Sequence, residues 1–188
     1  MSIYKKNLEL LTKNNVYSKE MEHDACGVGL IASTEGKKSR EVVEYGIEAL
    51  KAVWHRGAVD ADGKTGDGAG IHLEIPKDFF VEKIEVTGHT HDGSDICVGM
   101  IFLPRNDYSS QESCKTIVES ELTKNDFSIY GWRQVPVNPK VLGEKAFQTM
   151  PEIIQVLFKS NDKNLLDKDL ERKIYETRKK IENKAFNL

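Results

Sequence analysis

The chain has 188 residues, of which 39% are hydrophobic and 30% charged, so it is long enough for one globular domain with its own core. Its net charge of −3 argues against a nucleic-acid partner, and no apolar run reaches the roughly 18 residues that a membrane span needs. The N-terminus has no apolar stretch long enough for a secretory signal, so we expect no membrane and a cytoplasmic location.

The first third of the chain predicts an arm, a strand and a helix. Residues 1–25 are polar and weakly periodic, as in a leader or a loosely held arm. The apolar run at 26–34 predicts a strand that ends at a turn. A helix is expected to follow Ser39, a residue suited to cap a helix N-terminus. Its apolar positions recur at helical spacing, at Val43, Ile47, Leu50 and Trp54.

The rest of the chain alternates further strands and helices after a glycine-rich loop at 60–70. Alternating apolar residues predict a short strand at 71–75, closed by Pro76. This order of elements predicts an α+β fold with sheet layers covered by helices. The later elements are a short helix at 76–84, a strand buried on both faces at 96–104, a helix at 109–125 with Cys114, Ile117, Val118 and Leu122 facing inward, strands at 127–137 and 151–160, and a charged amphipathic helix at 165–185.

The three cysteines, Cys26, Cys97 and Cys114, are odd in number and far apart, which is not a disulfide framework. No CxxC pair suggests zinc, and we expect no metal site. Cys97 and Cys114 are most simply core residues. The stretch from His89 to Asp92 offers metal ligands but no matching third ligand, and a solvated turn is the better interpretation.

The glycine-rich loop resembles two known motifs and fits neither. Gly63, Lys64 and Thr65 match the end of a phosphate-binding loop, but Ala58 stands where that motif needs its first glycine. A calcium loop starting at Asp60 would have Thr65 and Ile71 at positions that need Gly and Glu. We therefore expect the glycines to allow close backbone approach and the aspartates to bond turns.

Cys26 is followed by Gly27 and Gly29, which leave room for a ligand or another backbone beside it. If the bond between Ala25 and Cys26 were cut, the free α-amine, with a pKa near ~8, would be a base for the thiol of its own residue. The residues alone favour a core cysteine at the start of a strand, so both interpretations stay open at this point.

The two segments CGVGLIAS and ALKAVWHRGAVDADGKTGDGAGIHLEIP together resemble the start of the glutaminase domain of glutamate synthase large subunits. That domain is a class II glutamine amidotransferase of the N-terminal-nucleophile hydrolase group. The resemblance runs from about His23 to the end of the chain and is densest from Cys26 to Phe80. The HRG motif followed by TGDGAG is specific to glutamate synthase within the class.

The resemblance implies a fold and a reaction. The fold is a four-layer αββα sandwich, of which this chain would form the first half, with 1–25 as a propeptide and 26–188 as a partial amidotransferase domain. Cys26 would attack the side-chain amide of L-glutamine, release ammonia and leave a glutamyl thioester for hydrolysis. The ammonia would then meet 2-oxoglutarate at a distant synthase site served by FMN and an iron–sulfur cluster. No cofactor is expected in this segment. The remaining synthase polypeptide and an electron-donating small subunit are the implied partners.

The resemblance also assigns supporting residues. Arg56 and Gly57 match the motif at the wall of the cysteine pocket, where an arginine favours a thiolate. For Arg56, a local helix-terminal cation is an equal alternative. Asp67, Gly68 and Gly70 would shape the pocket floor, and Gly27 would keep space clear for glutamine.

The sequence departs from the family after Phe80, because nothing there resembles the segments that hold the oxyanion and the substrate's α-carboxylate and α-amine. We therefore expect a fragment that is inactive alone, since one lost oxyanion donor already costs about 10²–10³ in rate. Two alternatives are another amide hydrolase of this fold and a non-catalytic subunit that kept the fold. The electron donor, the oligomeric state and the natural end of the chain stay open.

Overall fold

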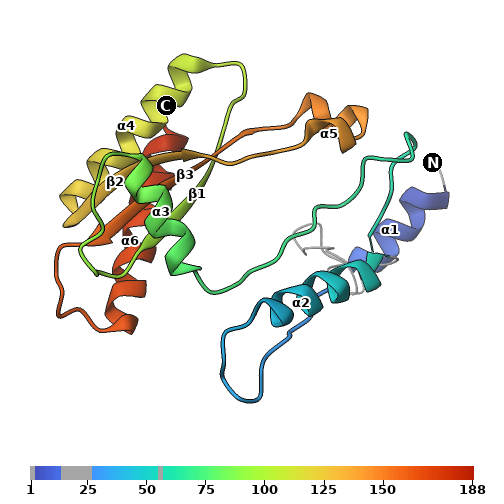
Figure 1. Ribbon diagram of the computed structural model, residues 1–188. Helices are drawn as coiled ribbons and strands as arrows, with labels where there is room; N and C mark the ends of the chain where they lie inside the picture. Colours follow the sequence, from blue (N-terminus) through green and yellow to red (C-terminus); the bar gives the residue numbers. More distant parts are fainter. Residues whose placement is uncertain (1–2, 14–26, 55–56) are drawn as a thin grey trace. The chain divides into compact units, whose positions relative to one another are not determined.

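The computed structural model describes residues 3–13, 27–54 and 57–188, and these divide into two compact units (Figure 1). The first unit contains the residues up to Val59 together with Gly66–Ile71. The second contains Asp60–Thr65 and His72–Leu188. No helix among the described residues is both long enough and apolar enough to span a membrane.

The first unit contains two helices, α1 (Ile3–Lys13) and α2 (Arg40–Ala52). The predicted cap is confirmed, because the Ser39 hydroxyl accepts a hydrogen bond from the Val42 N–H at 3.3 Å. Glu41 in the first turn and Lys51 in the last suit the helix dipole. The apolar side of α2 is only half-buried at Val43, Ile47 and Leu50.

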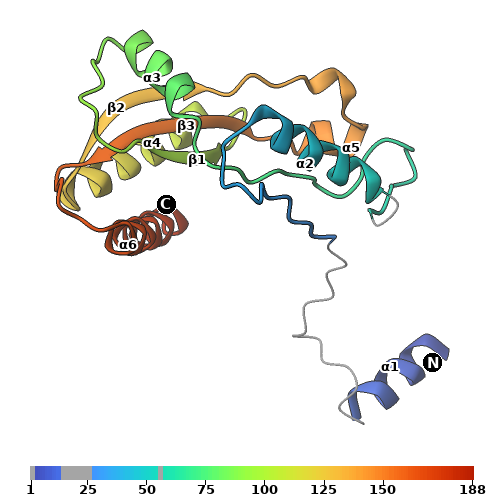
Figure 2. The same ribbon diagram turned by 60° about the horizontal axis from the view of Figure 1, so that its bottom comes forward.

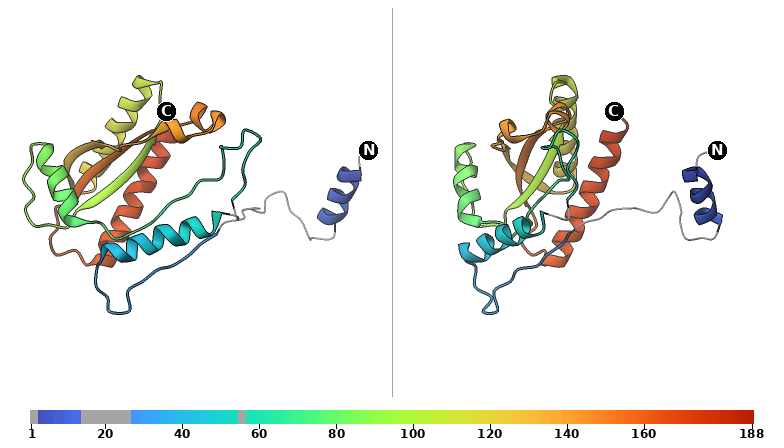
Figure 3. Two further views of the ribbon diagram at one scale, coloured as in Figure 1. Left: turned by 45° about the vertical axis from the view of Figure 1, so that its right-hand side comes forward. Right: turned by 90° about the vertical axis from the view of Figure 1, so that its right-hand side faces the viewer.

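Three features of the N-terminal third differ from the sequence prediction. Helix α1 was missed, because its weak periodicity suggested only an arm. Trp54 was predicted as the last apolar position of the helix, but it lies beyond the end of α2 and is 74% exposed. The strands predicted at 26–34 and 71–75 are also wrong as far as the described residues go, because 27–33 and 71–76 form no regular structure (Figure 3). An alternating pattern makes a strand only when another strand supplies hydrogen bonds, and no described segment pairs with either stretch.

The second unit is built on an antiparallel sheet of β1 (Cys97–Leu103), β2 (Phe127–Gln134) and β3 (Glu152–Ser160). The strand order is β1-β3-β2, so the last strand in the chain is the central one. Cys97 pairs with Phe158 and Leu103 with Glu152 on one side of β3. Phe127 pairs with Ser160 on the other side. The two outer strands are parallel to each other and are joined by α4 (Tyr108–Lys124), with β3 inserted between them.

Helices cover both faces of this sheet, as Figure 2 shows. On one face lie α4 and α6 (Asp167–Phe186), and on the other lies α3 (Lys77–Val86). Alternation along each strand sends neighbouring residues to opposite faces, which gives two apolar clusters. The first cluster is Cys97, Val118, Leu122, Phe127, Val156 and Phe158, and the second is Phe80, Ile84, Ile96, Tyr130 and Leu157. The described residues therefore have the predicted α+β character.

A β-bulge in β2 lets α3 approach the sheet closely. The pairing register shifts between Ile129 and Gly131, and Gly131 has a φ of 147°. A Cβ on Gly131 would lie 2.9 Å from the Thr87 methyl carbon. The Thr87 hydroxyl donates a hydrogen bond to the Tyr130 carbonyl at 2.8 Å. The absence of a side chain at this position therefore allows the end of α3 to dock on the sheet.

The strand predicted at 96–104 is present as β1, but the expectation of burial on both faces is wrong. Met100 is 50% exposed and Phe102 is 63% exposed. The strand lies at the edge of the sheet, and α3 covers the opposite end of that face. Two further short elements, the 3₁₀ turn η2 (Pro139–Val141) and α5 (Glu144–Gln148), were not predicted, because a loop rich in proline concealed them.

Candidate active site

The predicted site residues fall into two groups. Cys26 and Arg56 lie outside the described residues, so the structure neither places the nucleophile nor decides between the two roles for the arginine. Gly27, Gly57, Asp67 and Gly68 are described, and all four are exposed. Gly57 and Asp67 both lie at the base of one short hairpin, which spans residues 58–67.

The base of this hairpin is held by Asp67. Its backbone N–H donates to the Ala58 carbonyl at 3.1 Å, and its carboxylate Oδ2 accepts from the Ala58 N–H at 2.9 Å. Val59 and Gly66 form an antiparallel bridge directly beyond this pair. Just before the base, the Gly57 N–H donates to the Trp54 carbonyl at 3.0 Å. Asp67 therefore fixes the backbone that leaves the HRG motif, which gives the predicted pocket residue a definite structural role.

The tip of the hairpin is a turn organised by two aspartates. The Asp60 N–H donates to the Thr65 carbonyl at 2.7 Å, and its carboxylate accepts from the Ala61 N–H at 2.6 Å. Asp62 Oδ1 accepts from the N–H groups of Lys64 at 2.9 Å and Thr65 at 2.7 Å. This confirms the prediction that the aspartates bond turns.

These bonds also decide against phosphate binding at the tip. A phosphate cradle needs backbone N–H groups that point at the ligand, whereas the N–H groups of this turn donate within the hairpin. The hydroxyl of Thr65 donates to Asp62 Oδ2 at 2.6 Å. Hydrogen bonds from this hydroxyl and from the Lys64 and Thr65 amides lower the pKa of Asp62 to about 2. The carboxylate is thus committed to the turn as an anion.

The glycines of this region differ in what surrounds them. A Cβ on Gly66 would lie 2.8 Å from the Ala58 carbonyl oxygen, so this glycine permits the close approach of the two hairpin strands. A Cβ on Gly68 or Gly70 would meet nothing within 4 Å. The close approach expected of the glycines therefore occurs at Gly66, a position the sequence analysis did not single out, and the roles of Gly68 and Gly70 stay predictions.

His89 and His91, which suggested a metal site, instead contact residues of the same loop. His91 Nε2 lies 2.8 Å from the Ser94 carbonyl oxygen, and its Nδ1 accepts from the Gly93 N–H at 3.3 Å. His89 Nδ1 lies 3.1 Å from the Thr87 hydroxyl. Within the described part of the chain, no group of three or more His, Cys, Asp or Glu side chains is arranged to hold a metal. The two histidine rings therefore contact neighbouring residues of the loop before β1.

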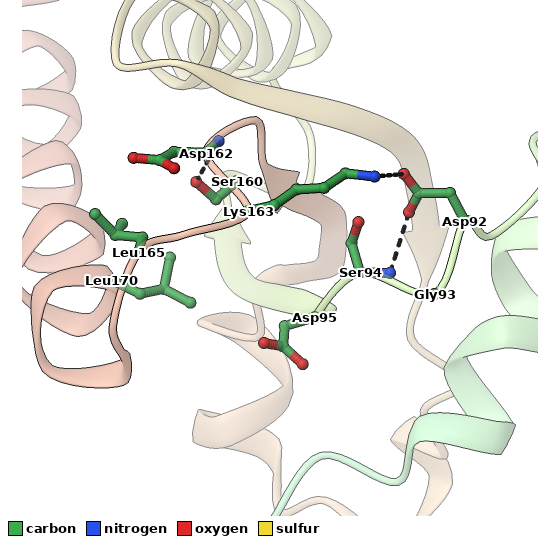
Figure 4. A pocket seen from close by; sticks show the side chains of 9 residues that line it. All are labelled: Asp92, Gly93, Ser94, Asp95, Ser160, Asp162, Lys163, Leu165 and Leu170. Carbon is green, nitrogen blue, oxygen red and sulfur yellow. Dashed lines mark hydrogen bonds and ion pairs between the residues drawn. The ribbon is translucent and has the colours of Figure 1, made fainter.

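A cavity of about 330 Å³ lies between the loop before β1 and the loop after β3 (Figure 4). Its polar lining centres on Asp92, whose carboxylate accepts from Lys159 Nζ at 2.7 Å and from the Ser94 N–H at 3.1 Å. Lys163 Nζ lies 3.8 Å from the same carboxylate. The hydrogen bonds from Lys159 and Ser94 hold the pKa of Asp92 well below its usual range.

The polar contacts of Asp92 extend to Tyr130 in the core. The phenol donates to Asp92 Oδ1 at 3.3 Å, and Lys159 Nζ lies 5.4 Å from the centre of the ring. Burial raises the pKa of Tyr130, and Asp92 raises the pKa of Lys159. Asp92 therefore ties the loop before β1 to Tyr130 of β2 and Lys159 of β3, which gives the polar side of this cavity a structural role.

The two described cysteines differ in burial. Cys97 lies in the first apolar cluster, where burial above all raises the pKa of its thiol to about 12. Cys114 is only half-buried on α4 and belongs to neither apolar cluster of the described residues, so its predicted place in the core is wrong. Cys97 is therefore a protonated core residue at neutral pH, as the sequence predicted.

Comparison with known proteins defines the class. The family profile described as "Glutamine amidotransferases class-II" matches residues 26–188, and its match begins at Cys26. The chain belongs to the class-II glutamine amidotransferase family.

The relatives that it resembles are glutamate synthases. It is 52% identical over 179 residues to the "Glutamate synthase [NADPH] large chain" of Azospirillum brasilense, covering 95% of this chain and 12% of that protein. It is 42% identical over 162 residues to the "Ferredoxin-dependent glutamate synthase 1" of Arabidopsis thaliana, covering 86% of this chain and 10% of that protein. It is 39% identical over 174 residues to the "Ferredoxin-dependent glutamate synthase" of Pyropia yezoensis, covering 92% and 11%. The chain thus spans 10–12% of the length of these relatives.

Proposed function

We propose that this chain is the N-terminal part of the glutaminase domain of a glutamate synthase and carries the nucleophile Cys26. The thiolate attacks the amide carbon of glutamine, and a proton passes to the amide nitrogen, which leaves as ammonia. Water then cleaves the thioester and regenerates the thiol, so glutamine and water give glutamate and ammonia. The free α-amine of Cys26, present after removal of residues 1–25, is the base for both steps.

The observation that carries this proposal is the position at which the family match begins. A profile that starts at Cys26 supports a boundary between residues 25 and 26, with a leader before it and the amidotransferase domain after it. An amine at the N-terminus of the domain provides a base next to the thiol without a histidine. The hairpin held by Asp67 supports a role for Gly57, and for Arg56 just before it, in the wall of the cysteine pocket.

The family assignment also supports a larger fold than the described sheet. A four-layer αββα sandwich contains more strands than the three of the described sheet. The stretches 27–33 and 71–75 are largely exposed and form no regular structure, and no strand pairs with them among the described residues. Val28 is 93% exposed and Leu30 is 89% exposed, and two such exposed apolar side chains close together support a surface that further polypeptide covers.

The cofactors of glutamate synthases, FMN and an iron–sulfur cluster, do not fit this segment. A cluster needs several cysteine thiolates, whereas this chain has three widely spaced cysteines and Cys97 is a protonated core residue. We propose that both cofactors belong to the remainder of the synthase polypeptide.

The electron donor and partners follow from the same relatives. Identity to the relative named for NADPH, 52%, exceeds the 39% and 42% to the two ferredoxin-dependent relatives. This difference supports a pyridine nucleotide as electron donor, delivered through a small subunit. We place the enzyme in the cytoplasm.

The test is the N-terminus and activity of the protein from its source cells. Intact mass and N-terminal sequencing are expected to find a polypeptide that begins at Cys26. Its glutaminase activity is expected to disappear in Cys26→Ala, while the isolated 188-residue chain releases no ammonia from glutamine. A mature protein that begins at Met1 or Ser2 would exclude the free-amine mechanism and favour a non-catalytic subunit.

A further inference from the structure

The tip of the hairpin lies against the start of α5, more than 75 residues further along the chain. Lys145 Nζ donates to Asp60 Oδ2 at 2.6 Å, and the Ala146 N–H donates to the Thr65 hydroxyl oxygen at 3.5 Å. The backbone N–H of Glu144 also contributes to the low pKa of Asp62. Three consecutive residues of α5 therefore contact the two aspartates and the threonine that organise the turn.

Gly143 makes this contact possible. It is buried, and a Cβ built on it would overlap Thr65 Oγ1, Asp62 Oδ2 and the Thr65 nitrogen. Its φ of −71° is one that any residue adopts. A methyl group at this position therefore introduces no backbone strain of its own, and its only direct effect is to push the turn away from α5.

Consecutive backbone pairs connect the tip of the hairpin to its base. Asp60 and Thr65, which contact α5, are hydrogen-bonded to each other. The Val59–Gly66 bridge is the next pair along the hairpin, and Ala58 with Asp67 is the pair after that. Three consecutive backbone pairs therefore join the anchored tip to the residue that follows Gly57.

We propose that Gly143 and Lys145 are positioning residues for glutamine binding, because they hold the turn at 60–65, whose hydrogen-bonded pairs continue to the residue that follows Gly57. This inference rests on the proposed function. It assigns a role to a segment after Phe80, where the sequence offered no site residue. No sequence pattern indicated this contact, since a glycine that starts a short helix gives no hint of the turn it contacts.

The contact of Gly143 and Lys145 with the turn at 60–65, called the anchor below, is expected to affect the affinity for glutamine more than the chemical step. If the hairpin leaves its arrangement for part of the time, the apparent affinity for glutamine is the intrinsic affinity multiplied by the fraction of molecules that remain arranged. Glutamine at saturation restores the arrangement. Loss of the anchor should therefore raise KM and leave kcat close to its original value.

The experiment uses the full-length gene product, with glutaminase kinetics and hydrogen exchange of residues 57–67 measured on each variant. Gly143→Ala is expected to raise KM for glutamine about tenfold, with kcat changed less than about twofold and faster exchange in the hairpin. Lys145→Met should raise KM by about two- to fivefold, because the Lys145–Asp60 pair is partly exposed. Lys145→Arg keeps a cation that can pair with Asp60, so its KM should stay close to the wild-type value. Lys140→Met, at an exposed lysine of η2, is the matched control and should change neither measurement.

Unchanged hydrogen exchange in Gly143→Ala would overturn the anchor itself. Faster exchange with an unchanged KM would show that the anchor holds the hairpin but has no role in glutamine binding, which overturns the positioning role. If the unmutated full-length protein has no glutaminase activity that depends on Cys26, the proposed function is wrong, and the positioning role is wrong with it. The exchange measurement would still decide independently whether the anchor exists.

Discussion

Glu121 on α4 and Lys184 on α6 form an ion pair that joins the two helices on one face of the sheet. The Glu121 side chain is only 5% exposed, and its carboxylate also lies 3.5 Å from Lys124 Nζ. The hydrogen bond from Lys184 is the main cause that lowers the pKa of Glu121. This carboxylate therefore links the helices as an anion that is largely removed from water.

Replacing Glu121 by Gln should lower the thermal midpoint of unfolding at pH 7, because both lysines lose their counter-charge. Since the folded-state pKa is below the ordinary 4.5, the contribution of Glu121 is fully present above that pH and is lost as the pH falls through the lowered value. The difference between wild type and Glu121→Gln should thus shrink in acid. Thermal melts between pH 3 and 7 test this, with the exposed Glu112→Gln as control. A difference that stays constant across this range would contradict it.

Leu157 is completely buried between the sheet and α3, in the cluster with Ile84 and Tyr130. Leu157→Ala should destabilise the second unit by about 2–5 kcal/mol, since it removes apolar contacts and leaves a cavity. Denaturant unfolding measures this, and Val86→Ala, at a position 82% exposed, should change the unfolding free energy by less than about 0.5 kcal/mol. A similar small effect for both variants would show that this cluster does not support the sheet.

Gly131→Ala should destabilise the chain by about 1–3 kcal/mol for two reasons. Alanine rarely adopts the φ of 147° at this bulge, and its methyl group would press on Thr87. Gly70→Ala, where a Cβ meets nothing within 4 Å, is the control for stability. Unfolding curves that place Gly131→Ala level with the control would exclude this glycine as the cause of the close approach of α3.

Cys97 should resist alkylation in the native protein at pH 8, because burial raises its pKa to about 12 and the thiolate is the reactive form. Iodoacetamide followed by peptide mass mapping should modify Cys97 only after urea is added. The variant Cys97→Ser identifies the peptide and is the control. Rapid labelling of the native protein would contradict this, because it would mean that β1 often separates from β3 and exposes Cys97.

Much of the second unit was predictable from its sequence. Strands β2 and β3 and helices α3, α4 and α6 were placed nearly correctly, because each buries a regular apolar face within this chain. Helix α2 was also predictable, since Ser39 forms its cap through local hydrogen bonds. These elements depend on signals that lie within a few residues, or on a core that the chain itself completes.

The misses share a physical cause. The apolar run at 26–34 predicts a strand, but a strand also needs a hydrogen-bonding neighbour, and no neighbour of 27–34 lies among the described residues. At the site, the turn chemistry of Asp60 and Asp62 was predictable because it is local. The contact of that turn with Gly143 and Lys145 was not, because more than 75 residues separate the partners and no periodic pattern connects them.

The position of β3 has a consequence for the order of folding during synthesis. Strands β1 and β2 leave the ribosome first, yet they do not pair with each other and each needs β3 for its hydrogen bonds. The growing chain must therefore keep two apolar strands apart from other partners until Ser160 has emerged. Nascent chains that end before Glu152 should bind chaperones and resist refolding, whereas chains that extend past α6 should reach a protease-resistant state in one cooperative step.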